Sequence, residues 1–215
     1  MLVQPLPKLY AIIDRATLEA HGVSVADFAA TLASASVSLL QYRDKSGSPQ
    51  QVLAAAAEIK AAFAGHDCLL VMNDRADLAA LAGWPAVHVG QGDLSVSDAQ
   101  RVLSSNIGEQ GIIGLSTHTD EQIIAADASG ADYIAIGPVF STATKPDAEK
   151  TIGLEGVRRA RALTSKPLVA IGGITRDDAR SVLDAGADSV AVISGLFAPG
   201  QTLAASVEDF LVRLR

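Results

Sequence analysis

Short apolar runs alternate with longer Ala-rich segments of helical period along the whole chain. Each apolar run spans four or five residues, which is the length of a buried strand. The runs predict strands at Leu9–Ile13, Ser38–Gln41, Cys68–Met72, Ala86–Val89, Gly111–Leu115, Tyr133–Ile136, Pro167–Ala170 and Ser189–Ile193. The segments between them predict helices near 24–35, 49–63, 75–82, 95–104, 119–129, 154–164, 175–185 and 201–214.

Eight strand–helix pairs in 215 residues predict an α/β fold, a single (β/α)8 TIM barrel. Capping residues support the helix boundaries: Ser48 precedes Pro49 at a helix start, and Thr175 is expected to cap a later helix. No linker divides the chain, so residues 1–215 are predicted to form one domain. The alternative is an open doubly wound sheet, but no G-x-G-x-x-G follows the first strand, where the chain reads Asp14-Arg15-Ala16.

Charge and composition narrow the class of partner. The net charge is −7, without the basic excess of a nucleic-acid binder, and no apolar stretch is long enough to span a membrane. The lone Cys68 cannot form an internal disulfide, and Met1 to Lys8 lacks signal-peptide features, so a cytoplasmic location is expected. The expected partners are phosphorylated small molecules; association into a homo-oligomer is left open.

Polar residues concentrate where the predicted strands end, which is where the loops of such barrels form active sites. This asymmetry between the two ends of the barrel indicates an enzyme. The residues are Gln41 to Lys45, Asn73 to Arg75, Gly90 to Asp93, Ser116 to His118, Thr142 to Lys145, Gly172-Gly173 and Ser194-Gly195.

Glycines follow both of the last two strands. Gly172-Gly173 and Ser194-Gly195 lie in the loops that form the usual barrel phosphate site, where backbone N–H groups approach anionic oxygens. These glycines could instead serve only tight turns. Their coincidence in both loops favours a phosphate site.

Two acidic residues follow two neighbouring strands. Asp74 and Asp93 would repel each other in one cavity unless a cation lies between them. Mg²⁺ takes one or two carboxylates and completes its shell with water and phosphate oxygens. Taken singly, Asp74 reads as a helix cap and Asp93 as part of a solvated turn. The pair together predicts a magnesium site.

Cationic and hydroxyl residues supply further anion contacts. If the second strand continues, Arg43 and Lys45 point the same way, while Gln41 offers an amide to a polar ring. The long 137–153 segment carries Thr142, Thr144 and Lys145, which suit oxyanion contacts, and it could close as a lid. His118 suits either a general base or a hydrogen bond to a neighbouring strand, so it is not placed in the catalytic set.

Taken together, these motifs resemble those of the thiamine phosphate synthase family, from about Leu9 to Phe197. The resemblance implies a Mg²⁺-dependent transferase that joins a pyrimidine diphosphate to a thiazole phosphate and releases diphosphate. It implies catalytic roles for Arg43, Lys45, Ser116 and Lys145, and metal binding by Asp74 and Asp93. The implied pyrimidine diphosphate contacts are Gln41, Tyr42, Arg43, Asp44, Lys45, Asn73, Ser116 and Lys145. The implied thiazole phosphate contacts are Thr142, Ala143, Thr144, Gly173, Ile193 and Ser194.

Two alternatives remain on the same barrel. Thiazole tautomerases use a histidine near the end of the fifth strand, where His118 lies, but they generally lack the paired acids. Asp74 and Asp93 therefore favour the synthase. The other alternative is a non-catalytic phosphate-binding barrel.

Overall fold

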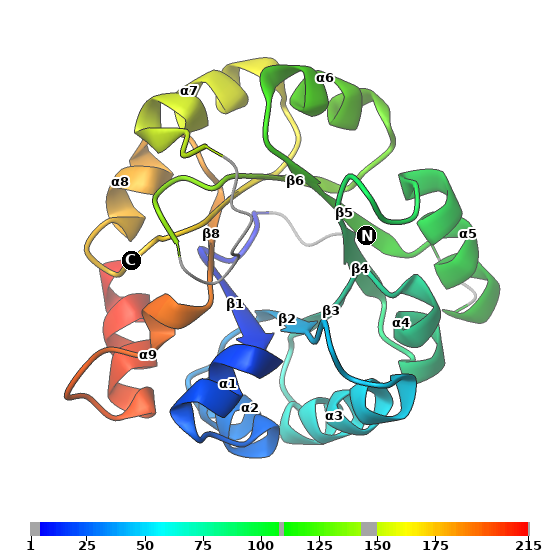
Figure 1. Ribbon diagram of the computed structural model, residues 1–215, viewed down its shortest axis with the longest axis vertical. Helices are drawn as coiled ribbons and strands as arrows, with labels where there is room; N and C mark the ends of the chain where they lie inside the picture. Colours follow the sequence, from blue (N-terminus) through cyan, green and yellow to red (C-terminus); the bar gives the residue numbers. More distant parts are fainter. Residues whose placement is uncertain (1–4, 108–109, 143–149, 215) are drawn as a thin grey trace.

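Parallel strands close into a barrel in chain order, with helices forming an outer ring (Figure 1). The computed structural model describes residues 5–107, 110–142 and 150–214, and eight strands are found there. They are β1 (Leu9–Asp14), β2 (Leu39–Arg43), β3 (Leu69–Asn73), β4 (Ala86–Val89), β5 (Ile112–Thr117), β6 (Tyr133–Ile136), β7 (Leu168–Ile171) and β8 (Ser189–Val192). The β1–β8 pairing completes the closure, which confirms the predicted (β/α)8 barrel and excludes the open sheet.

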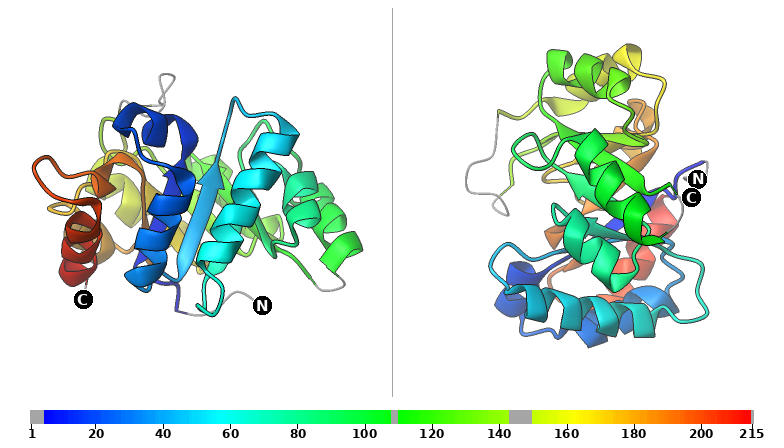
Figure 2. Two further views of the ribbon diagram at one scale, coloured as in Figure 1. Left: turned by 90° about the horizontal axis from the view of Figure 1, so that it is seen from below. Right: turned by 90° about the vertical axis from the view of Figure 1, so that its right-hand side faces the viewer.

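The described helices follow the strands. They are α1 (Arg15–His21), α2 (Val25–Ser34), α3 (Pro49–Ala62), α4 (Ala76–Ala82), α5 (Val96–Ile107), α6 (Asp120–Ala128), α7 (Gly153–Leu163), α8 (Ala179–Asp184) and α9 (Leu203–Arg213), with a 3₁₀ turn η1 (Ser194–Leu196). Figure 2 shows α1 lying at the rim above α2, on the side to which the strands point. Within the described part of the chain, no helix has the length and apolar character needed to cross a bilayer.

Alternate strand residues divide the core into two layers. Tyr10, Ile12, Leu39 and Val71 belong to a cluster inside the barrel, whereas Ala11 and its equivalents pack outward against the helices. This alternation is the two-residue period of a strand. The alternation places the last inward-facing residue of each strand at the mouth of the barrel. Side chains from different strands therefore point into the same region there.

The structure differs from the predicted elements at α1, β2 and α8, among others. Helix α1 was not predicted: the Asp14 side chain accepts from the backbone N–H of Thr17 and so caps a helix directly after β1. Strand β2 continues to Arg43 rather than ending at Gln41. Helix α8 begins at Ala179, because Thr175 opens a turn instead of capping the helix.

Candidate functional site

A cavity of about 190 Å³ opens at the carboxyl ends of β5 to β8. Ser116, Thr142, Gly173, Ile193 and Ser194 all line it. The structure therefore brings together the described residues of the thiazole phosphate set, and it adds Ser116 to them. His118 also lines the cavity, and its Nδ1 donates to the carbonyl oxygen of Gly137, directly after β6, at 2.7 Å. This contact resembles one of the two roles that the sequence left open for His118.

The glycines of this cavity are required by close backbone packing. Gly173 has φ of +64°, and a Cβ there would lie 2.4 Å from the carbonyl oxygen of Ser141. At Gly195 a Cβ would lie 2.7 Å from the carbonyl oxygen of Ile174. The turn explanation for these glycines therefore holds, and the same turns expose backbone to the cavity. The two interpretations do not exclude each other.

We expect Gly173→Ala to destabilise the protein and to weaken anion binding. The added methyl group meets backbone atoms that cannot rotate away, in a left-handed conformation that alanine disfavours. A loss of about 1–3 kcal/mol in the free energy of unfolding is expected. Urea denaturation measures it, with Gly200→Ala as the control, because Gly200 shares a positive φ but has no atom within 4 Å of its Cβ position. Equal losses in both variants would show that packing at Gly173 is unimportant.

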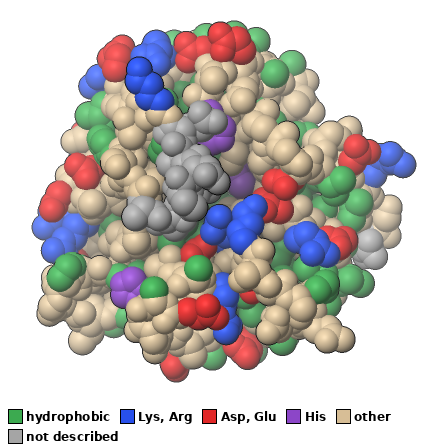
Figure 3. All heavy atoms as spheres, viewed as in Figure 1, with side chains coloured by type: hydrophobic (Ala, Val, Ile, Leu, Met, Phe, Trp, Pro, Cys, Tyr) green, Lys and Arg blue, Asp and Glu red, His purple; other side chains and the backbone are tan. Residues whose placement is uncertain are grey.

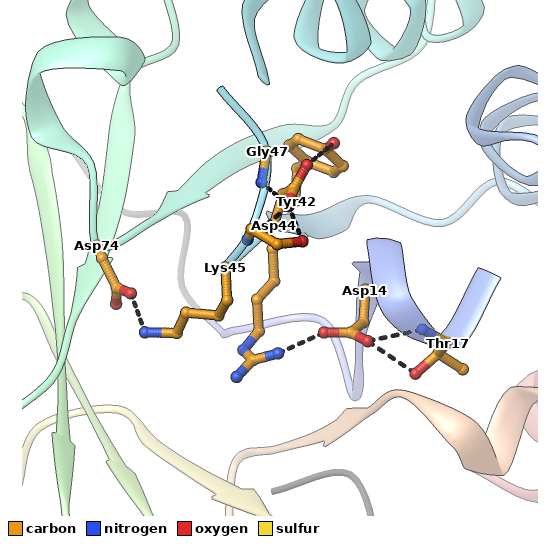
Figure 4. A network of polar contacts seen from close by, with 9 residues as sticks. Asp14, Thr17, Tyr42, Asp44, Lys45, Gly47 and Asp74 are labelled. Atoms are coloured by element: carbon orange, nitrogen blue, oxygen red, sulfur yellow. Dashed lines mark hydrogen bonds and ion pairs between the residues drawn. The ribbon is translucent and has the colours of Figure 1, made fainter. Parts of the chain in front are cut away.

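Arg43, the last residue of β2, and Lys45, just after it, contact different carboxylates on the two sides of the strand. The Arg43 guanidinium lies 2.5 Å from the buried carboxylate of Asp14, after β1. The Lys45 ammonium pairs with Asp74, after β3 (Figure 4). The expectation that both point the same way depended on the strand continuing to Lys45, and that condition is not met because β2 ends at Arg43. Both cations nevertheless lie at the mouth.

The two predicted metal ligands face each other. Partial burial and the adjacent Asp74 carboxylate raise the pKa of Asp93, while the Gly90 N–H and Lys45 oppose the rise. Asp74 has φ of +60°, a strained conformation for a residue with a side chain, and such strain concentrates at functional sites. Figure 3 shows basic and acidic side chains side by side on this face of the molecule.

The acid pair suits a hard cation. Among the described residues no group of three or more His, Cys, Asp and Glu side chains is placed to hold a metal. A cation at Asp74 and Asp93 would thus draw its other ligands from water or a substrate, which is the coordination that Mg²⁺ prefers. The Lys45 side chain is 54% exposed, so it is free to leave Asp74 for another anion.

The remaining predicted residues of β2 and β3 have separate places. Asn73 ends β3 in register with His88, and Gln41 lies buried inside the barrel with its Nε2 donating to Tyr10 Oη at 2.8 Å. Tyr42 and Asp44 do not join the group at the mouth. The ring of Tyr42 packs in the outer core, and the Asp44 carboxylate accepts from the N–H groups of the turn that follows. The predicted contacts at Ala143, Thr144 and Lys145 lie outside the described residues.

Comparison with known proteins identifies the family. A family model described as thiamine monophosphate synthase matches residues 9–196. The chain belongs to the thiamine monophosphate synthase family. It is 49% identical over 193 residues to a thiamine-phosphate synthase of Koribacter versatilis, covering 89% of each chain. It is 39% identical to a thiamine-phosphate synthase of Methanoregula boonei, covering 92% of this chain and 89% of the relative.

A solved structure agrees with the family assignment. The thiamine phosphate pyrophosphorylase of Pyrococcus furiosus superposes with a TM-score of 0.82 at 30% identity, covering 96% of this chain and 95% of that one. As a member of the thiamine monophosphate synthase family, the chain is a transferase of thiamine biosynthesis. The resemblance inferred from the sequence motifs is thereby confirmed.

Asp14 and His88 at the synthase site escaped sequence reasoning, and Gln91 was named only as part of the Gly90 to Asp93 group. Asp14 ends β1 and holds Arg43. Gln91 donates to the backbone oxygen of Ser116 at 2.6 Å and so joins the β4 loop to β5. His88 lies 2.8 Å from the hydroxyl of Ser116. Asp14 could have been found, because it is an acidic residue that directly follows the predicted strand Leu9–Ile13.

Proposed function

We propose that this chain joins 4-amino-2-methyl-5-hydroxymethylpyrimidine diphosphate to 4-methyl-5-(2-phosphooxyethyl)thiazole, forming thiamine monophosphate and diphosphate. The observation that supports this most is the division of the barrel mouth. Acids and cations gather over β1 to β4, while a cavity lined by glycine and serine opens over β5 to β8. Two phosphorylated substrates need two such places side by side.

The reaction forms a carbon–nitrogen bond and breaks a carbon–oxygen bond. The thiazole nitrogen supplies the electron pair to the pyrimidine methylene carbon, and the diphosphate oxygen leaves with the pair of the broken bond. Arg43 and Lys45 would stabilise the charge that grows on the leaving diphosphate, with Ser116 donating a hydrogen bond. Gly173 and Ser194 would hold the thiazole phosphate. The resulting orientation of the two substrates would contribute the remainder of the rate acceleration.

Asp74 and Asp93 would hold Mg²⁺ at this site. The support is that partial burial and the nearby Asp74 carboxylate raise the pKa of Asp93, and that both residues offer oxygen donors of the hard type. When bound, the ion supplies positive charge that offsets the overall negative charge of the protein at the place where diphosphate binds. Ala143, Thr144 and Lys145, which lie outside the described residues, would supply the other contacts predicted from the sequence.

The test is a coupled assay of diphosphate release with both substrates and Mg²⁺, with the product identified by mass spectrometry. We expect turnover that requires both substrates and stops when the metal is chelated. Activity on a carboxylated thiazole phosphate that survives chelation would instead indicate a tautomerase. Calorimetric binding without any reaction would indicate a non-catalytic phosphate-binding barrel.

A further inference from the structure

A continuous series of hydrogen bonds crosses the interior of the barrel from β2 to the mouth. Gln41 Nε2 donates to Tyr10 Oη at 2.8 Å, and the hydroxyls of Tyr10 and Tyr133 lie 2.9 Å apart. The Tyr133 hydroxyl lies 3.0 Å from Nδ1 of His88, and Nε2 of His88 lies 2.8 Å from Oγ of Ser116. The series thus ends on a residue that lines the cavity.

The two tyrosines are buried deeply enough that their hydroxyl hydrogens must go to protein acceptors. Both side chains are 1% exposed, and burial raises the pKa of each phenol, so both stay protonated. A tyrosine hydroxyl carries one hydrogen to donate and can also accept. Leaving such a hydrogen unpaired in the interior costs free energy, and nearly all buried polar groups avoid this.

The need to pair each buried hydroxyl hydrogen fixes the donor and the acceptor of every hydrogen bond in the series. The Gln41 amide nitrogen can only donate, so the Tyr10 oxygen accepts and the Tyr10 hydrogen goes to Tyr133. The Tyr133 hydrogen then goes to Nδ1 of His88. The hydrogen of the neutral imidazole is therefore on Nε2, which donates to Ser116. Ser116 accepts that bond and keeps its own hydrogen for another partner.

The packing around Tyr133 holds its ring in one position. The Tyr133 and His88 rings stack with centroids 5.5 Å apart, while Tyr10 meets Tyr133 edge-on. A Cβ at Gly114 would lie 2.0 Å from Cζ of Tyr133, so glycine leaves room for the ring beside β5. The position of the Tyr133 hydroxyl is therefore set by the shape of the interior.

We propose that Tyr10, Tyr133 and His88 are positioning residues that turn the Ser116 hydroxyl into a hydrogen-bond donor toward the diphosphate. This inference rests on the proposed function, in which Ser116 contacts that anion. A hydroxyl that binds an anion must donate. With the opposite imidazole tautomer, Ser116 would donate to His88 and present only lone pairs to the ligand. The buried series prevents that arrangement.

The tautomer of His88 can be measured without any assay of activity. In protein labelled with ¹⁵N-histidine, long-range ¹H–¹⁵N spectra report which ring nitrogen carries the hydrogen, and a His88→Gln variant assigns the signals. We expect the hydrogen on Nε2 in the wild-type protein and a loss of this preference in Tyr133→Phe. A wild-type His88 protonated on Nδ1, or on both nitrogens, would overturn the proposal.

A double-mutant cycle tests whether the series acts through Ser116. We expect Tyr133→Phe to lower kcat/KM about tenfold in the wild-type background, since it removes one directing hydrogen bond. In the Ser116→Ala background the same substitution should cost less than about twofold, because the group it directs is gone. Equal losses in both backgrounds would assign Tyr133 a purely structural role. If the proposed function fails, no variant turns over, and the imidazole spectra still decide the tautomer.

Discussion

Asp93→Asn is expected to lower kcat/KM for diphosphate release by about 10²–10³-fold, the effect of removing one key electrostatic stabiliser. Asparagine keeps an oxygen that can accept the Gly90 N–H, which Asp93 accepts at 2.8 Å. It removes one of the two facing negative charges, so the pair loses much of its attraction for Mg²⁺. Steady-state kinetics at several Mg²⁺ concentrations measure both effects.

Melting temperatures separate this loss from misfolding. Without Mg²⁺ the variant should melt no lower than the wild type, because the substitution relieves repulsion from Asp74. With Mg²⁺ and diphosphate the wild type should gain thermal stability that the variant does not. Asp184→Asn is the matched control: it is an exposed acid at the end of α8, paired with Arg180. Wild-type rates in Asp93→Asn would refute the metal assignment.

Arg43→Gln is expected to lower both activity and stability. The guanidinium is the partner of Asp14, whose side chain is 3% exposed, so its loss leaves a buried carboxylate without its cation. Removing one member of a buried ion pair costs about 3–5 kcal/mol. The lost charge at the diphosphate should reduce kcat/KM by about 10²-fold. Urea unfolding and diphosphate release measure the two losses separately.

A second substitution separates the contribution of Arg43 to stability from its contribution to activity. Asp14→Asn in the Arg43→Gln background replaces the orphaned carboxylate by a neutral amide that can still accept the Thr17 N–H at the start of α1. We expect most of the stability to return while activity stays low. Recovery of activity along with stability would show that Arg43 only supports the fold and does not act on the diphosphate.

The fold was predictable because its signals are local. Each buried strand is a short apolar run. Seven of the outer helices begin within a few residues of their predicted starts, at Val25, Pro49, Ala76, Val96, Asp120, Gly153 and Leu203. Helix α1 escaped because it is only seven residues long and its cap, Asp14, is also the last residue of β1. A helix that starts without an intervening loop leaves no turn signal to read.

The site was predictable as a set of residues but not as a set of contacts. Position at strand ends indicated Asp74, Asp93, Gly173 and Ser194, since parallel strands bring their ends to one face. The partners of Arg43 and Lys45 depended on where β2 stops, which alternation alone cannot show.

The interior hydrogen bonds were the hardest feature to predict. Tyr10 and Tyr133 are 123 residues apart and meet only through the register of the closed barrel. In the sequence each of them reads as one more apolar residue of a strand. Sequence position therefore gave no sign that their hydroxyls meet, and only the three-dimensional pairing reveals it.

The most direct test is a crystal structure of this chain with diphosphate and Mn²⁺, which stands in for Mg²⁺ and gives an anomalous signal. We predict a peak between the carboxylates of Asp74 and Asp93, with diphosphate oxygens completing the coordination and Arg43 or Lys45 turned toward the anion. A peak elsewhere on the barrel, or diphosphate bound away from both acids, would contradict the proposed site.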